Sequence, residues 1–109
     1  MNRRIYRRLI SVARKRRVLR YNEIAPLAGL DMKKTADRNE IGRILGIIST
    51  FEHQHHRPLL SAVVIHSSDN IPGKGFFELA MNLNLYDGRG DFMFFHNELC
   101  KVHNYWSHH

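Results

Sequence analysis

The sequence has almost no cysteine and no long apolar run. Its 109 residues include a single cysteine, Cys100, so no disulfide can form within the chain. No window approaches the roughly 18 uninterrupted apolar residues that a membrane span needs. The N-terminal segment also lacks the apolar centre of a secretion signal. These absences predict a reduced, cytoplasmic protein without a membrane partner, and a chain of this length is expected to form one domain.

Acidic residues are missing from the first 20 positions. That segment holds nine of the 17 Lys and Arg residues, for a net charge of +9. The rest of the chain holds eight basic and ten acidic residues, a net charge of −2, which gives +7 for the whole chain. Positive charge concentrated in one segment is typical of proteins that bind a polyanion, with nucleic acid first and anionic lipid second. An arginine-rich helix that only faces solvent is the alternative.

The basic segment, residues 1–20, is predicted to be an amphipathic helix. Ile5, Leu9, Val12 and Ala13 fall on one face at the 3.6-residue period. The cations predicted to contact phosphates lie on the other faces: Arg3, Arg4, Arg7, Arg8, Arg14 and Lys15. Because the apolar stripe is narrow and lacks Trp and Phe, it favours packing on a small core over lying on a membrane.

Residues 21–54 predict a helix-turn-helix. A short helix ends at Gly29, and a longer helix begins between Thr35 and Asn39 and continues to about residue 53. The inner face of the longer helix is Ile41, Ile44, Leu45, Ile48 and Glu52; its outer face is Asn39, Gly42, Arg43, Gly46 and Thr50. A small, polar and basic outer face is typical of a recognition helix that binds in the major groove.

The outer face of this helix contains residue types that contact base edges. Arg and Asn bind guanine and adenine bidentately, so we expect Arg38, Asn39 and Arg43 to face the groove. Gly42 and Gly46 allow a close approach, either by a nucleic-acid backbone or by another helix of the same protein. The sequence leaves these two alternatives open.

Residues 58–80 predict a strand followed by a wing loop. Leu59 to Ile65 is a short apolar run typical of a buried strand, and apolar residues at 76, 79, 80 and 83 then predict a helix. Lys74, between two glycines, lies where backbone N–H groups could hold a phosphate. The segment lacks the first Gly and the Ser/Thr of a Walker A motif, so nucleotide hydrolysis is not predicted.

A closing helix is predicted over residues 91–107. Phe92, Phe95, Leu99, Val102 and Trp106 recur at helical spacing, which predicts a core stripe, with Cys100 beside it as a buried, inert thiol. The expected fold is therefore mainly α with a small β element (α+β), a winged-helix-like single domain over residues 1–109.

Two clusters suggest chemistry but match no catalytic or metal-binding spacing. Glu52, His53, His55 and His56 contain no HExxH pattern, and the histidines are better explained as helix-end groups that face the dipole or a phosphate. His66 with Ser61 and Asp69 is a conceivable acid–base set of the kind that chance produces among eight histidines. We predict no catalytic residue, no metal and no cofactor.

Three segments in order resemble a known family. YNEIAPLAG (21–29), IGRILG (41–46) and PLLSAVVIHSSDNIPGKG (58–75) are similar to the winged-helix DNA-binding domain of alkylguanine alkyltransferases and alkyltransferase-like proteins. That family has Pro-Cys-His-Arg or Pro-Trp-His-Arg where this chain has Pro58-Leu-Leu-Ser61. The resemblance therefore implies DNA binding without alkyl transfer. The run RPLLSAVVI with PGKGFFELA is also similar to small proteins of bacteria and their mobile elements, which implies a prokaryotic or phage source.

The sequence thus predicts a non-enzymatic protein that binds nucleic acid, with duplex DNA favoured. Its short recognition surface means that real base specificity would require a homodimer. Two alternatives remain open. One is a small metal-dependent nuclease or other nucleic-acid enzyme using Glu52, His53 and His56, or His66 and Asp69. The other is a phage or mobile-element protein whose basic helix binds an acidic protein partner.

Overall fold

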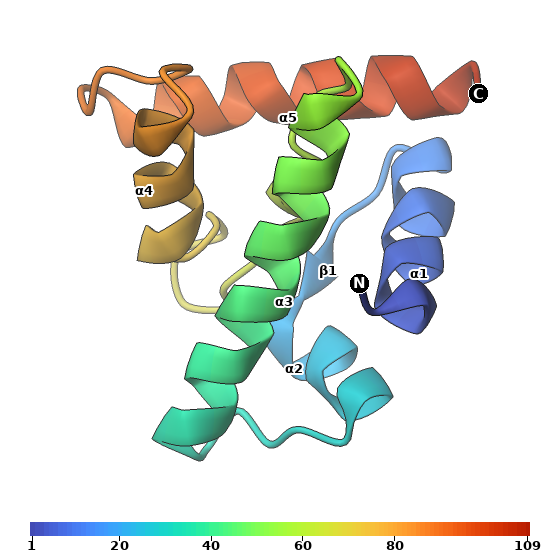
Figure 1. The fold of residues 1–109 in the computed structure, drawn as a ribbon, viewed down its shortest axis with the longest axis vertical. Helices are drawn as coiled ribbons and strands as arrows, with labels where there is room; N and C mark the ends of the chain where they lie inside the picture. Colours follow the sequence, from blue (N-terminus) through green and yellow to red (C-terminus); the bar gives the residue numbers. More distant parts are fainter.

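Five α-helices and a two-stranded sheet enclose one apolar core in a computed structural model that describes residues 1–109 (Figure 1). The helices are α1 (Arg3–Arg14), α2 (Tyr21–Ile24), α3 (Thr35–Gln54), α4 (Lys74–Asn82) and α5 (Asp91–Ser107). The strands are β1 (Leu19–Arg20) and β2 (Val64–Ile65), and two 3₁₀ turns cover Ala25–Ala28 and Leu60–Val63. In Figure 1, α3 runs through the middle, with α1 on one side, α4 on the other and α5 across one end.

The first part of the basic segment folds as the predicted amphipathic helix, but this helix ends at Arg14, and Leu19–Arg20 forms the strand β1 instead of continuing it. Asn2 caps α1 by accepting a hydrogen bond from the Ile5 backbone N–H at 3.0 Å. The inward face is Ile5, Leu9, Val12 and Ala13, all buried against α5 and the Leu60–Val63 turn. The hydrophobic effect therefore fixes this face toward the core and leaves the cations of α1 toward solvent.

The long helix α3 buries the predicted inner face. Its buried residues are Ile41, Ile44, Leu45, Ile48, Ser49 and Glu52. The preceding short helix continues into the Ala25–Ala28 turn and ends at Gly29, whose φ of 70° is the left-handed conformation that favours glycine. The two helical segments and the turn between them are thus where the sequence places them.

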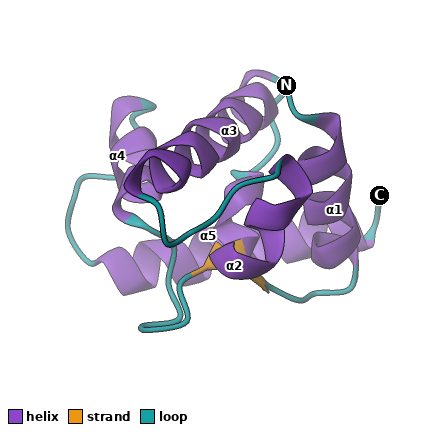
Figure 2. Ribbon diagram, turned by 90° about the horizontal axis from the view of Figure 1, so that it is seen from below, coloured by secondary structure: helices purple, strands orange, loops and turns teal.

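The predicted strand from Leu59 to Ile65 is mostly not a strand. The whole run is buried, but Leu60–Val63 forms a 3₁₀ turn and only Val64–Ile65 pairs, in parallel, with Leu19–Arg20. A short, fully apolar run is compatible with any buried backbone, so its periodicity could not distinguish these conformations. The loop after β2 projects from the strand pair and leads into α4 (Figure 2).

Helix α5 coincides with the predicted closing helix, but two of its predicted burial assignments are wrong. Phe92 is 61% exposed, and Cys100 is exposed rather than a buried thiol. The buried face of α5 is Phe95, Glu98, Val102 and Trp106. Because α5 lies across one end of the molecule, only this side of it is covered.

The observed fold confirms the predicted class, mainly α with a small β element in one compact unit of 30 × 30 × 25 Å. The winged-helix resemblance stays a prediction. None of the helices combines the length and the apolar character needed to cross a membrane.

Candidate nucleic-acid interface

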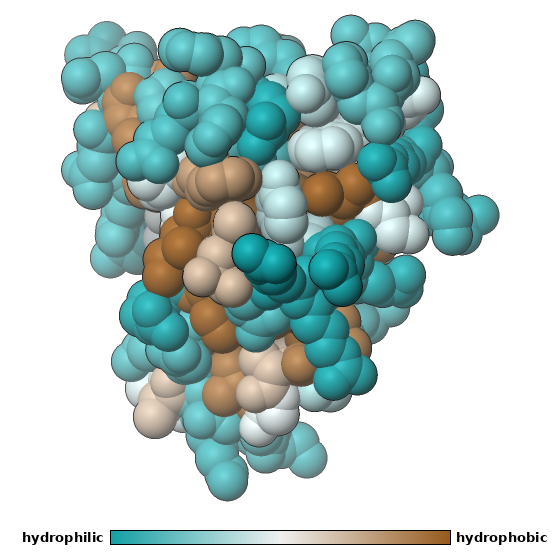
Figure 3. Space-filling view, turned by 45° about the vertical axis from the view of Figure 1, so that its right-hand side comes forward, coloured by the Kyte–Doolittle hydropathy of each residue, from teal (hydrophilic) through white to brown (hydrophobic).

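The cations of α1 form an exposed surface without acidic partners. All six predicted phosphate contacts on this helix and its C-terminal end are exposed: Arg3, Arg4, Arg7, Arg8, Arg14 and Lys15. The four ion pairs of the protein all lie elsewhere: Arg43–Glu40, Arg57–Glu52, Lys74–Glu78 and Lys101–Glu98. Figure 3, which brings the α1 side forward, shows hydrophilic residues over most of this face beside a hydrophobic band. We call the six exposed cations the α1 face.

Arg14 is also part of the protein's own structure. Its Nη2 donates to the His109 carbonyl at 3.0 Å, and its guanidinium lies 5.9 Å from the centre of the Trp106 ring. The neighbouring Arg16 donates to the Ser107 hydroxyl at 3.0 Å. These contacts attach the end of α1 to the end of α5, so Arg14 is held in place, whereas Arg3, Arg4, Arg7 and Arg8 project freely.

Arg43 lies on the outer face of α3, next to the start of α1. It lines a shallow hollow together with Met1 and Asn2. Its guanidinium donates two hydrogen bonds of 2.7 Å to Glu40, which lower the pKa of Glu40 and raise that of Arg43. Both side chains are well exposed, so solvent screens this pair and it can open at little cost.

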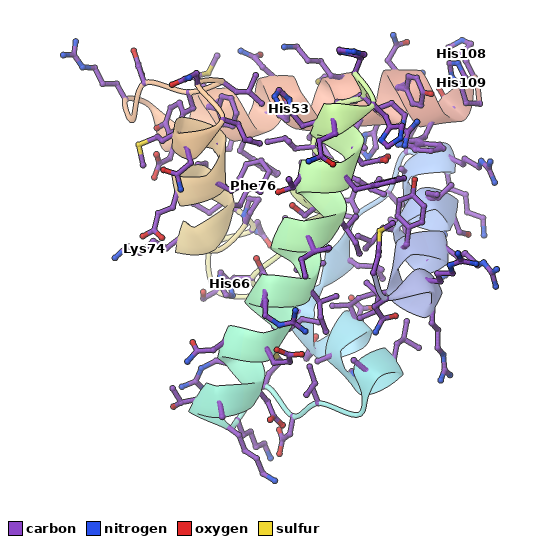
Figure 4. All side chains as sticks on the ribbon, viewed as in Figure 1. His53, His66, Lys74, Phe76, His108 and His109 are labelled. Atoms are coloured by element: carbon purple, nitrogen blue, oxygen red, sulfur yellow. The ribbon has the colours of Figure 1, made fainter.

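Arg38, Asn39 and Lys74 all line a second place, a cleft of about 300 Å³ between α3 and the start of α4. Arg38 is fixed there by hydrogen bonds of 2.9 Å to the Met32 carbonyl and to the Thr35 hydroxyl. The Lys74 ammonium is 3.5 Å from Glu78 and points away from α3 (Figure 4). We call this space the α3–α4 cleft; it is separate from the α1 face.

The α3–α4 cleft explains the two glycines of α3. Both Gly42 and Gly46 line it, and a Cβ added at either would meet nothing within 4 Å. No helix of the protein therefore packs against these positions. Of the two alternatives left by the sequence, the close approach of an internal helix is wrong, and the glycines face open space.

One side of the cleft is fixed by Tyr21 and His66. Their rings stack with centroids 4.4 Å apart, and the Tyr21 hydroxyl accepts a 2.8 Å hydrogen bond from the Gly73 N–H. A Cβ at Gly73 would lie 3.0 Å from His66 Nε2, so a larger residue there would push against the two rings. Burial raises the pKa of Tyr21, against the opposing effect of the Gly73 hydrogen bond.

The histidine-rich end of α3 does not form the site that the nuclease alternative needs. Glu52 is fully buried and faces Tyr6 and Arg57. His53 and His56 line a different hollow beside α5, and no three His, Cys, Asp or Glu side chains lie where they could hold one metal ion. Figure 4 shows His53 next to α5, whereas His66 lies beside the middle of α3, away from α5.

The second conceivable set is not connected either. Ser61 is bonded to Ser49 through hydroxyl oxygens 2.6 Å apart, and the Asp69 carboxylate accepts from the Ile71 N–H at 3.2 Å. His66 instead stacks on Tyr21, so the structure shows no hydrogen bond among Ser61, His66 and Asp69.

The α3–α4 cleft was not predicted from the sequence. Its two walls lie about thirty residues apart in the chain, at Gly42 and Gly73, and nothing local predicts that they meet. The signals that the sequence offers are the glycine pair at i and i+4 and the Gly-Lys-Gly at 73–75, and neither indicates that the two segments are neighbours. Tyr21 and His66 carried no signal that would identify them as lining residues.

Comparison with protein-family models, curated proteins and solved structures finds no match in any of the three.

Proposed function

We propose that this protein is a non-enzymatic, cytoplasmic nucleic-acid-binding protein that binds duplex DNA. The observation that carries the proposal is the α1 face, where exposed cations lack acidic partners while every ion pair lies elsewhere. Like charges at this density repel one another, and phosphates of a polyanion would remove that repulsion. Release of counterions from the nucleic acid would then supply most of the affinity.

Base contacts would come from the outer face of α3. Arg43 lies beside the start of α1, so it can reach a base edge while α1 lies on the backbone. Reaching a guanine requires Arg43 to leave Glu40, a change that costs little for an exposed pair. The protein measures 30 Å in its longest dimension, about one turn of duplex (~34 Å), so one copy reads few bases. A homodimer is the means by which real sequence specificity would arise.

The proposal is tested by fluorescence anisotropy of labelled duplex DNA, single-stranded DNA and duplex RNA across a salt series. Duplex DNA should bind most tightly, and the logarithm of the binding constant should fall by about 0.9 per phosphate contact for each tenfold rise in salt. Each mixture is also incubated with magnesium or manganese and run on a gel. Intact probes are expected, whereas metal-dependent shortening would make the protein a nuclease.

Two variants that remove exposed cations from different places locate the interface. Replacing Arg3, Arg4, Arg7 and Arg8 together by Gln removes four exposed cations of the α1 face. Replacing Arg89 and Lys101 by Gln removes two exposed cations from elsewhere. The first variant should lower both affinity and salt slope, and the second should leave both nearly unchanged. Binding of no probe by the wild type would contradict the proposal and favour an acidic protein partner.

A further inference from the structure

The α3–α4 cleft combines apolar walls with positive charge, unlike the convex α1 face. Its apolar lining comes from Ile41, Leu45, Phe76 and Leu79, and its polar lining includes Arg38, Asn39 and His66. No Asp or Glu lines it. A concave site with apolar walls and a few converging polar groups is typical of small-ligand binding, and its size of about 300 Å³ lies at the small end of such sites. A ligand that fits would be anionic at one end and flat and apolar at the other.

The glycines of α3 make room for that flat part. Glycine inside a helix costs roughly 1 kcal/mol relative to alanine. Gly42 and Gly46 bear this cost although no part of the protein occupies the space next to them. Both glycines line the cleft, so a larger residue at either position would narrow it.

The start of α4 forms the end of the site that would bind the anionic group of the ligand. Gly73 is the N-cap and has no side chain to cap the helix, and no acid lies in the first turn. The Gly73 N–H is used by Tyr21, whereas the N–H groups of Lys74 and Gly75 donate to no acceptor in the protein. Exposed N–H groups at the positive end of a helix favour a phosphate. Arg38, fixed on the α3 side by two hydrogen bonds, adds a permanent positive charge to the same cleft.

We propose that the α3–α4 cleft binds one nucleotide unit. The phosphate lies at the N–H groups of Lys74 and Gly75, the base lies over Gly42 and Gly46, and Asn39 contacts the base edge. If the ligand is an unpaired nucleotide of a nucleic-acid strand, the inference rests on the proposed function. If the ligand is a free nucleotide, the inference is independent of that function. The two sources share one chemistry, and the experiment separates them.

The seven glycines of the chain give a direct readout. Four of them line the cleft, Gly42, Gly46, Gly73 and Gly75, and the other three do not: Gly29, Gly88 and Gly90. AMP, GMP, CMP and UMP are titrated into a ¹⁵N-labelled sample, with adenosine and inorganic phosphate as partial probes. The backbone amide signals of the glycines are followed by NMR, and a change in the position of a signal reports binding near that glycine. We expect at least one nucleotide to shift the cleft glycines selectively, with either partial probe at least tenfold weaker. The proposal is overturned if no nucleotide at millimolar concentration moves the cleft glycines, or if all seven move alike.

Variants separate the base and phosphate parts of the site. Gly42→Leu fills the cleft without breaking the helix, and Asn97→Leu, on the exposed side of α5, is its matched control. Lys74→Ala removes the ammonium, whereas Lys74→Pro also removes the N–H at a position where proline suits a helix. Gly42→Leu should weaken nucleotide binding at least tenfold, and Lys74→Pro should weaken it more than Lys74→Ala. Wild-type affinity in Gly42→Leu would overturn the proposal.

Oligonucleotide probes show whether the cleft binds an unpaired nucleotide of a strand or a free nucleotide. A duplex with a single-stranded overhang is compared with its blunt form, in the wild type and in Gly42→Leu. Tighter binding of the overhang, lost in Gly42→Leu, assigns the site to an unpaired nucleotide; no preference, with mononucleotides still bound, assigns it to a free one. Loss of duplex binding while the cleft glycines still respond would sink only the proposed function. Duplex binding with silent cleft glycines would sink only this inference.

Discussion

Arg57 donates two hydrogen bonds to one oxygen of the fully buried Glu52, from Nε at 3.0 Å and from Nη2 at 2.7 Å. The Tyr6 hydroxyl donates to the same oxygen at 3.0 Å, while the second oxygen of Glu52 has no partner in the protein. The pKa of Tyr6 is raised, first by burial and then by Glu52, and the pKa of Arg57 is raised by its hydrogen bonds to Glu52. This cluster links α1 to α3 and so helps to fix the orientation of the basic helix.

Arg57→Met is expected to destabilise the protein by about 3–5 kcal/mol, because it leaves a buried carboxylate without its cation. Tyr6→Phe should cost only about 1 kcal/mol, since one hydrogen bond is lost. Urea unfolding followed by circular dichroism measures both. The double variant Arg57→Met with Glu52→Leu should recover much of the loss. An Arg57→Met variant as stable as the wild type would show that the buried Glu52 carboxylate is not stabilised by Arg57.

Gly42→Ala and Gly46→Ala are each expected to raise the free energy of unfolding by about 1 kcal/mol, because alanine favours the helix and the added methyl groups meet no atom. Gly29→Ala is the control with the opposite sign. Its φ of 70° strains any residue with a Cβ, although the space around it is equally open. Urea unfolding of the three variants tests this, and destabilisation by Gly42→Ala would show that its surroundings are tighter than the structure indicates.

The helical parts of the fold could be predicted because amphipathic periodicity is local. Ile5, Leu9 and Val12, for example, are buried where their spacing places them. The Leu59–Ile65 run was misassigned since a fully buried segment has no polar face to reveal its period. The predicted burial of Phe92 and Cys100 was wrong for another reason. A helix that lies across one end of a small domain is covered on only one side.

The candidate site was only half predictable. All ten predicted contacts are exposed, which composition and period could indicate. Their division into the α1 face and the α3–α4 cleft depends on long-range packing of α4 beside α3, which no local pattern encodes. Glu40, the ion-pair partner of Arg43, lies three residues away on the same helix, a spacing at which opposite charges pair, so this contact could have been predicted from the sequence.

Alkaline pH should destabilise the protein through its tyrosines. Partial burial and a hydrogen bond to Asp91 raise the pKa of Tyr86 to about 12, and burial raises that of Tyr21 above the ordinary 10.0. A raised folded-state pKa means that the stabilisation is complete below pH 10 and is lost as pH rises through the folded-state value. The free energy of unfolding should therefore fall above about pH 10, as measured by urea unfolding along a pH series.

Tyr86→Phe is the control for this pH dependence. A phenolate absorbance titration of the folded protein should lose its step near pH 12 in this variant, because the pKa of about 12 belongs to Tyr86. The fall in stability above pH 10 should also become shallower. An unchanged titration curve in Tyr86→Phe would assign the late step to another tyrosine.

Arg7 and Arg43 should differ in what they contribute to DNA binding. Arg7 projects from the α1 face, so Arg7→Ala is expected to lower affinity equally for all duplex sequences and to reduce the salt slope by about 1. Arg43→Ala should both weaken binding and relax base preference by about 1–3 kcal/mol at one position, because a bidentate base contact would be lost.

Glu40→Gln tests the same contact from the other side. It frees Arg43 from its two 2.7 Å hydrogen bonds to a carboxylate and is expected to strengthen duplex binding. Anisotropy against a randomised set of duplexes measures all three variants. If Arg43→Ala affected every sequence as evenly as Arg7→Ala does, α3 would contact only the backbone, and any base reading would have to come from elsewhere on the protein.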